Sequence, residues 1–511
     1  MEFVITTPLY YVNDKPHLGS AYTTIACDTI ARFRRLKGDH VTFITGVDEH
    51  GQKIQQTAES NGISPQVHCD IINQNYRELW SNWNITFDRY IRTTDRNHEK
   101  LVKELFSRVL SNGDIYLGKQ EGWYCVGCEE YKDKPPAETE PFCELHQKPL
   151  EWRNEENLFF RLSKYQSQIE DLLKNDNFIR PTTRQNEVHN FVKQGLKDFS
   201  ISRLGLNWGI PVPNHPGHTF YVWFDALTGY LTALLNDGEL QSFSRLSDIG
   251  WQNSLHIIGK DILRFHAVYW PAMLISAGIS PPSKVFGHGF ITREGKKMSK
   301  SIGNVLDPND LLKEYGENSV RWYLLRDIDF GSDGDFQKNR FVDIVNNDLA
   351  NTIGNLLNRT TTMSRKWFNG RTPPITPEQI NERNILRDNI ECNVKNYLDG
   401  LDELNFKNAA EAIIDIASTS NTYLNDKAPW KLIKDISQQS TVGHQIYNVL
   451  DSCRIIGFLL CPMLPDLSEA ILNQLGETPS ENDWIPQLNW GLLQAGLKLP
   501  EPKPVILKLE K

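Results

Sequence analysis

Strand-like and helix-like segments alternate at the start of the chain, and this alternation limits the fold more than any other feature. The stretch EFVITTPLYYV (residues 2–12) resembles a strand, residues 20–38 have helical spacing, and residues 40–47 return to a strand pattern. Such a succession predicts a parallel sheet covered by helices. The same texture returns after residue 220, so we expect an α/β domain built from two stretches of chain.

Changes in composition and in the spacing of apolar residues divide the rest of the chain. Residues 116–220 are rich in Trp, Pro, Gly and Cys with short strand-like pieces, which indicates an insertion and not a continuation of the sheet. From about residue 341 onward, apolar residues recur at helical spacing, as in an all-α bundle. The predicted segments are 1–115 and 221–285 for the two halves of the α/β domain, 116–220 for the insertion, 286–340 for a connecting region and 341–511 for the bundle.

Composition excludes several classes of protein. A chain of 511 residues is too long for one core, and its net charge of −9 disfavours a protein that coats nucleic acid, although a local basic patch would suffice for a nucleic-acid substrate. No apolar run approaches the length of a membrane span, and the N-terminus lacks a signal peptide's basic region. We expect a cytoplasmic protein with no membrane partner.

The cysteines point to a metal site. Eight cysteines are too few for a disulfide scaffold, and three of them crowd into CVGCEEYKDKPPAETEPFCELH. Cys125, Cys128, Cys143 and His146 have the spacing of one complete tetrahedral set of soft ligands. A closed shell of four ligands leaves no position for a reactive water, so we predict one structural Zn²⁺ in a knuckle. The alternative is a chance cluster in a Trp- and Gly-rich segment.

Two stretches of sequence have residues that are suitable for binding a polyphosphate. In PHLGS, His17 lies at a strand-to-helix turn, and Gly19 and Ser20 open the helix, where backbone amides attract anions. In KKMSKS (residues 296–301), lysines and serines in a Gly-flanked loop place cations and donors around a phosphate chain. Taken singly, each stretch has another interpretation: the first is a capped helix with an incidental histidine, and the second is a solvated basic loop. Both alternatives stay open at this point. A P-loop is excluded, because the glycine spacing is one residue too long and Lys297 replaces Ser or Thr.

Together, HLGS after the first strand and KMSKS after the last resemble the paired nucleotide signatures of class I aminoacyl-tRNA synthetases, and the whole chain resembles the short bacterial methionyl-tRNA synthetase family. The resemblance implies a Rossmann-like catalytic domain, a zinc-knuckle connective insertion, a KMSKS loop with a stem-contact region, and an anticodon-binding bundle. It also implies methionine–tRNA ligase activity: ATP with Mg²⁺ activates L-methionine to methionyl-adenylate, and the acyl group moves to the 3′ end of initiator and elongator tRNA(Met).

The resemblance assigns roles to residues near these signatures. The catalytic residues are His17, Lys297 and Lys300. The ATP-binding residues are His17, Gly19, Ser20, Gly259, Lys260, Asp261, Lys297, Ser299 and Lys300. The family usually has a second histidine where this chain has Ser20, and serine donates a hydrogen bond but carries no charge. Its contribution should therefore be smaller.

The chemistry of methionine determines which residue types a pocket for it needs. A long, unbranched thioether side chain calls for aromatic walls with few polar groups, and the ammonium group calls for a carboxylate. By resemblance the pocket residues are Leu9, Tyr11, Asp48, Trp223, Ala226, Leu227, Tyr230, Ile262 and His266. Without the resemblance, an aromatic stripe is core and a buried histidine is structural.

The resemblance also implies which residues of the bundle read the CAU anticodon. Asn355 and Arg359 are spaced i and i+4 on one helix, and Trp430 offers a stacking surface. Arg365 and Lys366 add possible phosphate contacts. Without the resemblance this is an amphipathic helix with a polar face.

Other interpretations fit less well. Synthetases for leucine, isoleucine or valine carry a larger editing insertion than residues 116–220, and the cysteinyl enzyme holds zinc in its catalytic pocket. A non-catalytic zinc-knuckle RNA-binding protein would have degraded nucleotide loops, and a nucleotidylyltransferase has no use for the bundle. The segment DEHG lacks the partners of a metal or helicase motif. Because no further RNA-binding domain follows the bundle, we expect a monomer.

Overall fold

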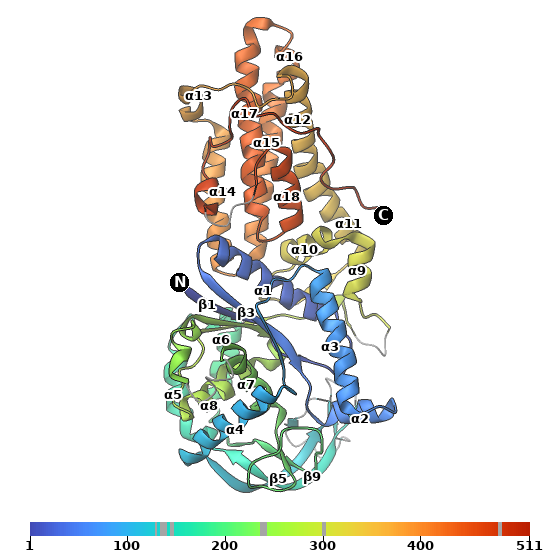
Figure 1. Ribbon diagram of the computed structural model, residues 1–511, viewed down its shortest axis with the longest axis vertical. Helices are drawn as coiled ribbons and strands as arrows, with labels where there is room; N and C mark the ends of the chain where they lie inside the picture. Colours follow the sequence, from blue (N-terminus) through green and yellow to red (C-terminus); the bar gives the residue numbers. More distant parts are fainter. Residues whose placement is uncertain are drawn as a thin grey trace. The chain divides into compact units, whose positions relative to one another are not determined.

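The computed structural model describes residues 1–127, 130–132, 141–143, 148–235, 243–298, 303–478 and 483–510. The chain forms two compact units (Figure 1). Unit 1 comprises residues 1–27 and 41–288, and unit 2 comprises residues 28–40 and 289–511. The first long helix, α1 (Leu18–Leu36), contributes its start to unit 1 and its end to unit 2.

Unit 1 is built on a parallel sheet. The strand order is β10-β15-β14-β1-β3-β2, with β4 paired to β3. The strands are β1 (Glu2–Thr6), β2 (Tyr10–Tyr11), β3 (His40–Asp48), β4 (Arg89–Arg92), β10 (Ile179–Arg180), β14 (Ser254–Gly259) and β15 (Lys284–His288). The chain leaves β1 toward β3 on one side and returns to β14 on the other, so the strand order reverses at β1. In open parallel sheets, ligands bind outside the carboxyl ends of the strands at such a reversal.

The central strands are buried along almost their whole length. Only the first residue of β1 is exposed, and β14 is buried except at its last residue. Continuous burial of this kind is typical of a parallel sheet covered on both faces by helices. The covering helices include α2 (Gln52–Ser60), α3 (Pro65–Asn82), α4 (Arg96–Ser111), α7 (Val222–Leu234) and α8 (Trp270–Ser276). The predicted α/β class with a parallel sheet is confirmed.

The segment predicted as an insertion forms a separate antiparallel sheet for most of its length. Its long strands, β5 (Ile115–Cys125) and β9 (Glu151–Phe160), pair with each other and with the short strands β6 (Glu130–Lys132) and β11 (Phe199–Ser200). A second pair joins β12 (Ser202–Leu204) to β13 (His218–Phe220), and a third joins β7 (Phe142–Cys143) to β8 (Lys148–Pro149).

One strand of that segment does continue the parallel sheet. Ile179 and Arg180 of β10 pair with Val285 and Phe286 of β15 and form the sheet's edge. The helices α5 (Gln166–Leu173) and α6 (Thr182–Lys193) flank this strand in the chain. Two residues are too few to show a strand's alternating pattern, so the pairing was not visible in the sequence.

The part of unit 2 that follows residue 288 begins with a small sheet. The strands β16 (Ile291–Arg293) and β17 (Lys296–Lys297) form a hairpin, and β18 (Gly334–Phe336) pairs with β16 in parallel. The turn residues Glu294 and Gly295 both have positive φ, of 51° and 74°, as a two-residue hairpin turn requires. This hairpin leads directly into the KMSKS segment.

The remainder of unit 2 is helical, as predicted from residue 341 onward. The helices are α9 (Pro308–Tyr315), α10 (Glu317–Arg326), α11 (Lys338–Val345), the π-helix η7 (Asn346–Gly354), α12 (Asn355–Trp367), α13 (Pro377–Asn381), α14 (Ile385–Asp402), α15 (Phe406–Lys427), α16 (Pro429–Leu432), α17 (Gln439–Leu460), α18 (Pro465–Gln474) and α19 (Trp484–Gln487). Helices α14, α15 and α17 pack side by side (Figure 1).

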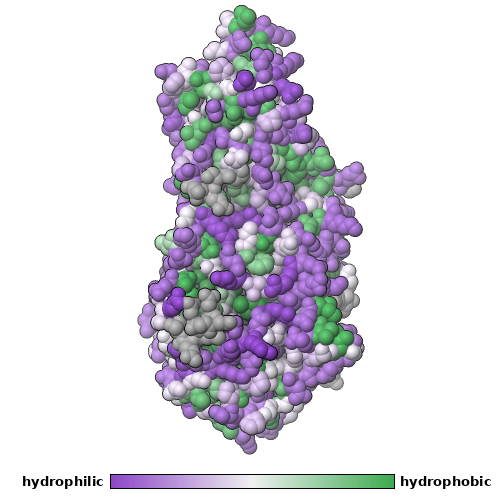
Figure 2. Space-filling model, viewed as in Figure 1, coloured by the Kyte–Doolittle hydropathy of each residue, from purple (hydrophilic) through white to green (hydrophobic). Residues whose placement is uncertain are grey.

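The visible surface is mainly polar. Hydrophilic side chains dominate the face in Figure 2, and apolar ones lie in small groups between them. None of the described helices combines the length and the apolarity needed to cross a bilayer.

Candidate active site

Two predicted residues meet at the carboxyl end of the sheet. Asp48 is the last residue of β3, and the parallel pairing of β2 with β3 sets Tyr11 directly opposite it. The Asp48 side chain is buried, with 6% of its surface exposed. A carboxylate held in a buried position beside an aromatic ring suits a substrate ammonium group.

Four of the residues predicted to line the methionine pocket lie on helix α7. Trp223, Ala226, Leu227 and Tyr230 lie on it at spacings of three, four and seven residues, so they share one face. Leu9 packs directly onto this helix, because a Cβ atom at Gly229 would lie only 2.5 Å from the Leu9 Cδ1 atom. The glycine therefore permits the close approach between the segment after β1 and α7.

The Trp223 ring is stacked on Phe265, with ring centroids 3.9 Å apart and an interplanar angle of 5°. Phe265 was not among the predicted pocket residues. Its contact with Trp223 spans more than forty positions of sequence, which no local pattern reveals.

His266 lies in a single π-helical turn, η5 (Phe265–Tyr269), which follows Ile262. Its Nδ1 atom is 3.1 Å from the Ile262 carbonyl oxygen, and its Nε2 atom is 2.8 Å from the Tyr230 hydroxyl. A carbonyl only accepts, so Nδ1 carries the hydrogen and the Tyr230 hydroxyl donates to Nε2. Burial lowers the pKa of His266 to about 4, so the ring is neutral at physiological pH. Turns of this kind are frequent at functional sites.

The predicted nucleotide turn is held by its own histidine. The Gly19 amide donates to the Nδ1 atom of His17 at 3.0 Å, so Nε2 is the donor that the neutral ring presents outward. A Cβ atom at Gly19 would lie 2.8 Å from the ring, which explains why glycine stands there. The ring reaches solvent, yet desolvation by the surrounding protein atoms lowers the pKa of His17, with Asp14 acting in the opposite sense.

Ser20 has a different position. It is 4% exposed, and its carbonyl accepts from the hydroxyls of Tyr10 and Thr24. The serine predicted to donate to phosphate is therefore buried.

The turn Gly259–Lys260–Asp261 lies close to the start of α1. It follows β14 directly, and the pairing of β14 with β15 sets Gly259 opposite His288. The His288 Nε2 atom is 2.7 Å from the Thr23 hydroxyl of α1. The structure thus brings together two stretches of the predicted ATP site that lie about 240 positions apart in the sequence.

In unit 2, two of the predicted anticodon residues are in contact. The Arg359 guanidinium lies 5.8 Å from the centre of the Trp430 ring, and its Nη2 atom donates to the Asn425 side chain at 3.0 Å. The Trp430 ring is 37% exposed, and Asn355 is exposed one helical turn before Arg359. An exposed ring beside a cation is a suitable platform for an unstacked RNA base.

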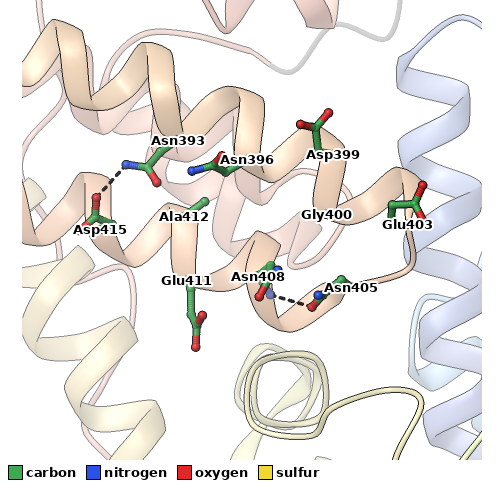
Figure 3. Close-up of a pocket in the computed structure, with 10 residues that line it drawn as sticks. All are labelled: Asn393, Asn396, Asp399, Gly400, Glu403, Asn405, Asn408, Glu411, Ala412 and Asp415. Carbon is green, nitrogen blue, oxygen red and sulfur yellow. Dashed lines mark hydrogen bonds between the residues drawn. The ribbon is translucent and has the colours of Figure 1, made fainter. Parts of the chain in front are cut away.

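A separate pocket lies between α14 and α15 and contains none of the predicted residues (Figure 3). Amide and carboxylate side chains line it, including Asp399, Glu403, Glu411 and Asp415. Its negative charge would repel RNA phosphates, which makes it unsuitable for the tRNA backbone.

Comparisons with known proteins decide the family. Residues 3–135 and 132–361 match the family model for class I tRNA synthetases (M), and residues 374–511 match that for the anticodon binding domain of methionyl tRNA ligase. A methionine–tRNA ligase of Synechocystis is 50% identical over 99% of this chain and 98% of its own. The chain belongs to the methionyl-tRNA synthetase family.

Members of this family include an Arabidopsis thaliana chloroplastic/mitochondrial methionine–tRNA ligase, which is 48% identical over 99% of this chain and 83% of its own. A solved structure of Mycobacterium tuberculosis methionyl-tRNA synthetase in complex with methionyl-adenylate is also similar. It is 38% identical, covers 99% of both chains and has a TM-score of 0.91. The likeness extends over both units, so the family assignment covers the whole chain.

The second signature of the family lies in unit 2. Lys297 is the last residue of β17, and its backbone pairs with Thr292 of β16. Ser299 and Lys300 lie outside the described residues. Their predicted roles stay predictions.

The predicted zinc ligands are described in part. Cys125 ends β5 and Cys143 ends β7, and both thiols are buried in a small cluster with Leu150, against which Trp123 packs. Cys128 and His146 lie outside the described residues. Among the residues with described positions, no three His, Cys, Asp or Glu side chains could hold a metal ion. The knuckle therefore stays a prediction, with two buried thiols of suitable chemistry.

Sequence analysis missed a buried polar network that includes a residue of α7 between the predicted pocket residues. Asp225 lies within the pocket segment of α7, and its carboxylate contacts His50 and His98. Both histidines are more than a hundred positions away in the sequence. The only local signal was the segment DEHG, which contains Asp48 and His50 and for which no partner could be named.

Proposed function

We propose that this chain, as a methionine–tRNA ligase of class I, activates L-methionine with ATP and transfers it to initiator and elongator tRNA(Met). The proposal depends mainly on one observation: a buried carboxylate, Asp48, ends β3 at the carboxyl end of the parallel sheet, and α7 with its aromatic residues packs against Leu9 just after β1. The methionyl-adenylate bound to the Mycobacterium tuberculosis relative supports the same reaction.

For methionine, Asp48 holds the ammonium group, and the Tyr11 ring covers it from β2. Trp223, Ala226, Leu227 and Tyr230 line the side-chain pocket from α7, with Leu9 and Ile262 closing it. His266 presents a neutral, fixed imidazole toward Tyr230, and this pair is the polar element near the thioether. A pocket with so few polar groups suits methionine better than smaller or more polar amino acids.

For ATP, the outward Nε2–H of His17 and the backbone around Gly19 bind phosphate oxygens, and Gly259, Lys260 and Asp261 approach the adenosine and the phosphates. Ser20, buried under the turn, acts by holding its shape. Lys297, Ser299 and Lys300 bind the pyrophosphate portion, which enters as the Mg²⁺ complex. His17, Lys297 and Lys300 are the residues that stabilise the charge developing on the phosphates.

In unit 2, Asn355, Arg359 and Trp430 read the anticodon, with Trp430 stacking on a base. Arg365 and Lys366 lie further along α12, and the Arg365 guanidinium is 3.4 Å from Glu501. We also propose that the enzyme works in the cytoplasm as a monomer. Sedimentation showing a stable dimer would contradict the monomer.

The decisive experiment is ATP–pyrophosphate exchange with methionine, leucine, isoleucine, valine and cysteine in parallel. We expect exchange with methionine and at least a hundredfold less with the others. Equal exchange with another amino acid would reject methionine specificity, and no exchange with any would reject the enzyme.

We further propose one structural Zn²⁺ held by Cys125, Cys128, Cys143 and His146. The two described thiols are buried in an apolar cluster, where a metal would stabilise their charged forms. Metal analysis of the purified protein should find one zinc per chain, and Cys125→Ser or Cys143→Ser should lose it. Cys392→Ser is the matched control, because Cys392 is exposed on α14. Full zinc content in the Cys125 variant would refute the site.

A further inference from the structure

Asp225 joins two histidines in a buried network beside the proposed methionine pocket. Its Oδ2 atom lies 2.6 Å from the Nδ1 atom of His50, and its Oδ1 atom lies 2.6 Å from the Nε2 atom of His98. The other ring nitrogen of His98 is 2.9 Å from the Thr232 hydroxyl. Asp225 and His98 are fully buried, and His50 is 7% exposed.

The direction of these hydrogen bonds follows from the charge of the carboxylate. Burial raises the pKa of Asp225, but the contacts with His50 and His98 outweigh it and hold the pKa below its ordinary value. The ionised carboxylate only accepts, so each histidine donates to one of its oxygens. Such charge-assisted bonds are short and directional, and both oxygens of Asp225 are used.

His50 also contacts Asp48, the residue that is proposed to bind the substrate ammonium. The backbone amide of His50 donates to the Oδ1 atom of Asp48 at 3.4 Å. The bond to Asp225 therefore anchors the residue whose amide contacts Asp48, while Trp208 holds the Glu49 carbonyl of the same peptide unit. Asp225, which sits between Trp223 and Ala226 in α7, is thus linked through His50 to the Asp48 carboxylate.

Other contacts hold the same segment but do not reach α7. The Trp208 indole donates to the Glu49 carbonyl at 2.5 Å, and the Glu49 carboxylate accepts from Arg92 Nε at 2.9 Å and from the Thr94 hydroxyl. These bonds fix the segment to its surroundings. The hydrogen bond between His50 and Asp225 connects the segment to α7.

We propose that Asp225 is a positioning residue for methionine, which through His50 sets the Asp48 carboxylate at a fixed separation from the α7 wall. The inference rests on the proposed function, because it assumes that Asp48 and α7 hold the two ends of the substrate. Through His98 and Thr232, the same carboxylate also fixes α7 against α4. A methionine that must meet both Asp48 and the wall gains affinity only if their separation is preset.

The test is Asp225→Asn, which keeps the size of the side chain but replaces one acceptor oxygen with a nitrogen that cannot accept. We expect the KM for methionine in pyrophosphate exchange to rise about tenfold, while the KM for ATP stays within twofold and kcat within threefold. A role limited to stability would lower the melting temperature without this separation of the two KM values.

Asp114→Asn is the matched control. Asp114 is another fully buried carboxylate of unit 1, and it accepts from Lys164 at 2.6 Å and from Ser276 at 2.7 Å. Its loss should lower the melting temperature to a similar extent and leave the KM for methionine unchanged. A rise of the methionine KM in both variants would overturn the specific role of Asp225.

A milder variant keeps the inference testable if Asp225→Asn does not fold. Thr232→Val removes the second contact of His98, together with a bond from the Thr232 hydroxyl to the Thr228 carbonyl within α7, and should raise the methionine KM two- to threefold. An unchanged methionine KM in every folded variant, with an active wild type, overturns the positioning role alone. A wild type that exchanges with no amino acid overturns the proposed function and this inference with it.

Discussion

The two proposed recognition sites of the chain are built in opposite ways. In unit 1, Asp48, Tyr230 and His266 are buried; Tyr230 and His266, from different segments, are bonded to each other, and Asp48 accepts from the His50 amide. In unit 2, Trp430 is 37% exposed, and its cation partner Arg359 lies beside it on the surface. A small ligand needs a preformed, desolvated pocket, whereas an RNA base needs an open platform that the RNA itself covers. The contrast predicts that substitutions in unit 1 affect activation and those in unit 2 affect tRNA use.

The largest expected effect tests the buried site. Asp48→Asn removes the charge that pairs with the substrate ammonium in a desolvated position, a loss of about 3 to 4 kcal/mol. The KM for methionine should rise about a hundred- to a thousandfold in pyrophosphate exchange, with the KM for ATP little changed. Asp171→Asn, an exposed carboxylate of α5 paired with Lys174, should have no effect. A rise of the methionine KM below threefold in the Asp48 variant would contradict the proposed role of Asp48 in binding the ammonium group.

The second test separates chemistry from methionine binding. Lys300→Ala should lower the rate of adenylate formation about a hundredfold, because its charge acts on the developing pyrophosphate. The dissociation constant for methionine should change less than twofold in a direct binding measurement. Lys296→Ala in β17 is the control and should change the rate less than threefold. Equal losses of rate and affinity would contradict the assigned role.

The third test concerns the exposed site. Trp430→Ala should raise the KM for tRNA about tenfold, since stacking of one base contributes about 1 to 3 kcal/mol. Pyrophosphate exchange, which needs no tRNA, should be unaffected. Ile436→Ala, at an apolar position that is 87% exposed in the same unit, should leave both measurements unchanged. A parallel fall in exchange would show that the helical bundle is not a separate reader, and the contrast between the two sites would fail.

The smallest expected effect is a pH dependence of the free energy of unfolding, which tests whether His266 is buried. The pKa of His266 is about 4 against an ordinary value of 6.5, so between these pH values the unfolded chain binds a proton there and the folded chain does not. The free energy of unfolding should therefore fall as the pH is lowered, with about 2 kcal/mol lost from this group between pH 7 and pH 5. Urea unfolding of wild type and His266→Gln at both pH values measures it. An identical pH dependence in the two proteins would mean that His266 is not desolvated.

The larger features of the fold could be predicted, because they repeat locally. The strand–helix alternation of residues 2–47 predicted the parallel sheet, and helical spacing after residue 341 predicted α11 to α18. The strand-to-helix turn at His17 was also visible, since the glycine that lets His17 fold back is its near neighbour in sequence. The edge strand β10 was not, because its partner β15 lies more than a hundred positions away.

The candidate site also combines features that the sequence predicted with features that only the structure shows. The sequence by itself determined which side chains are available near each strand end: Asp48 after β3, the aromatic residues of α7, and Gly259 after β14. Only the tertiary structure decided that Asp225 would meet His50 and His98, and that Phe265 would stack on Trp223. Local patterns record what a residue does within one turn or one strand, whereas such contacts form only when the sheet and its helices have packed.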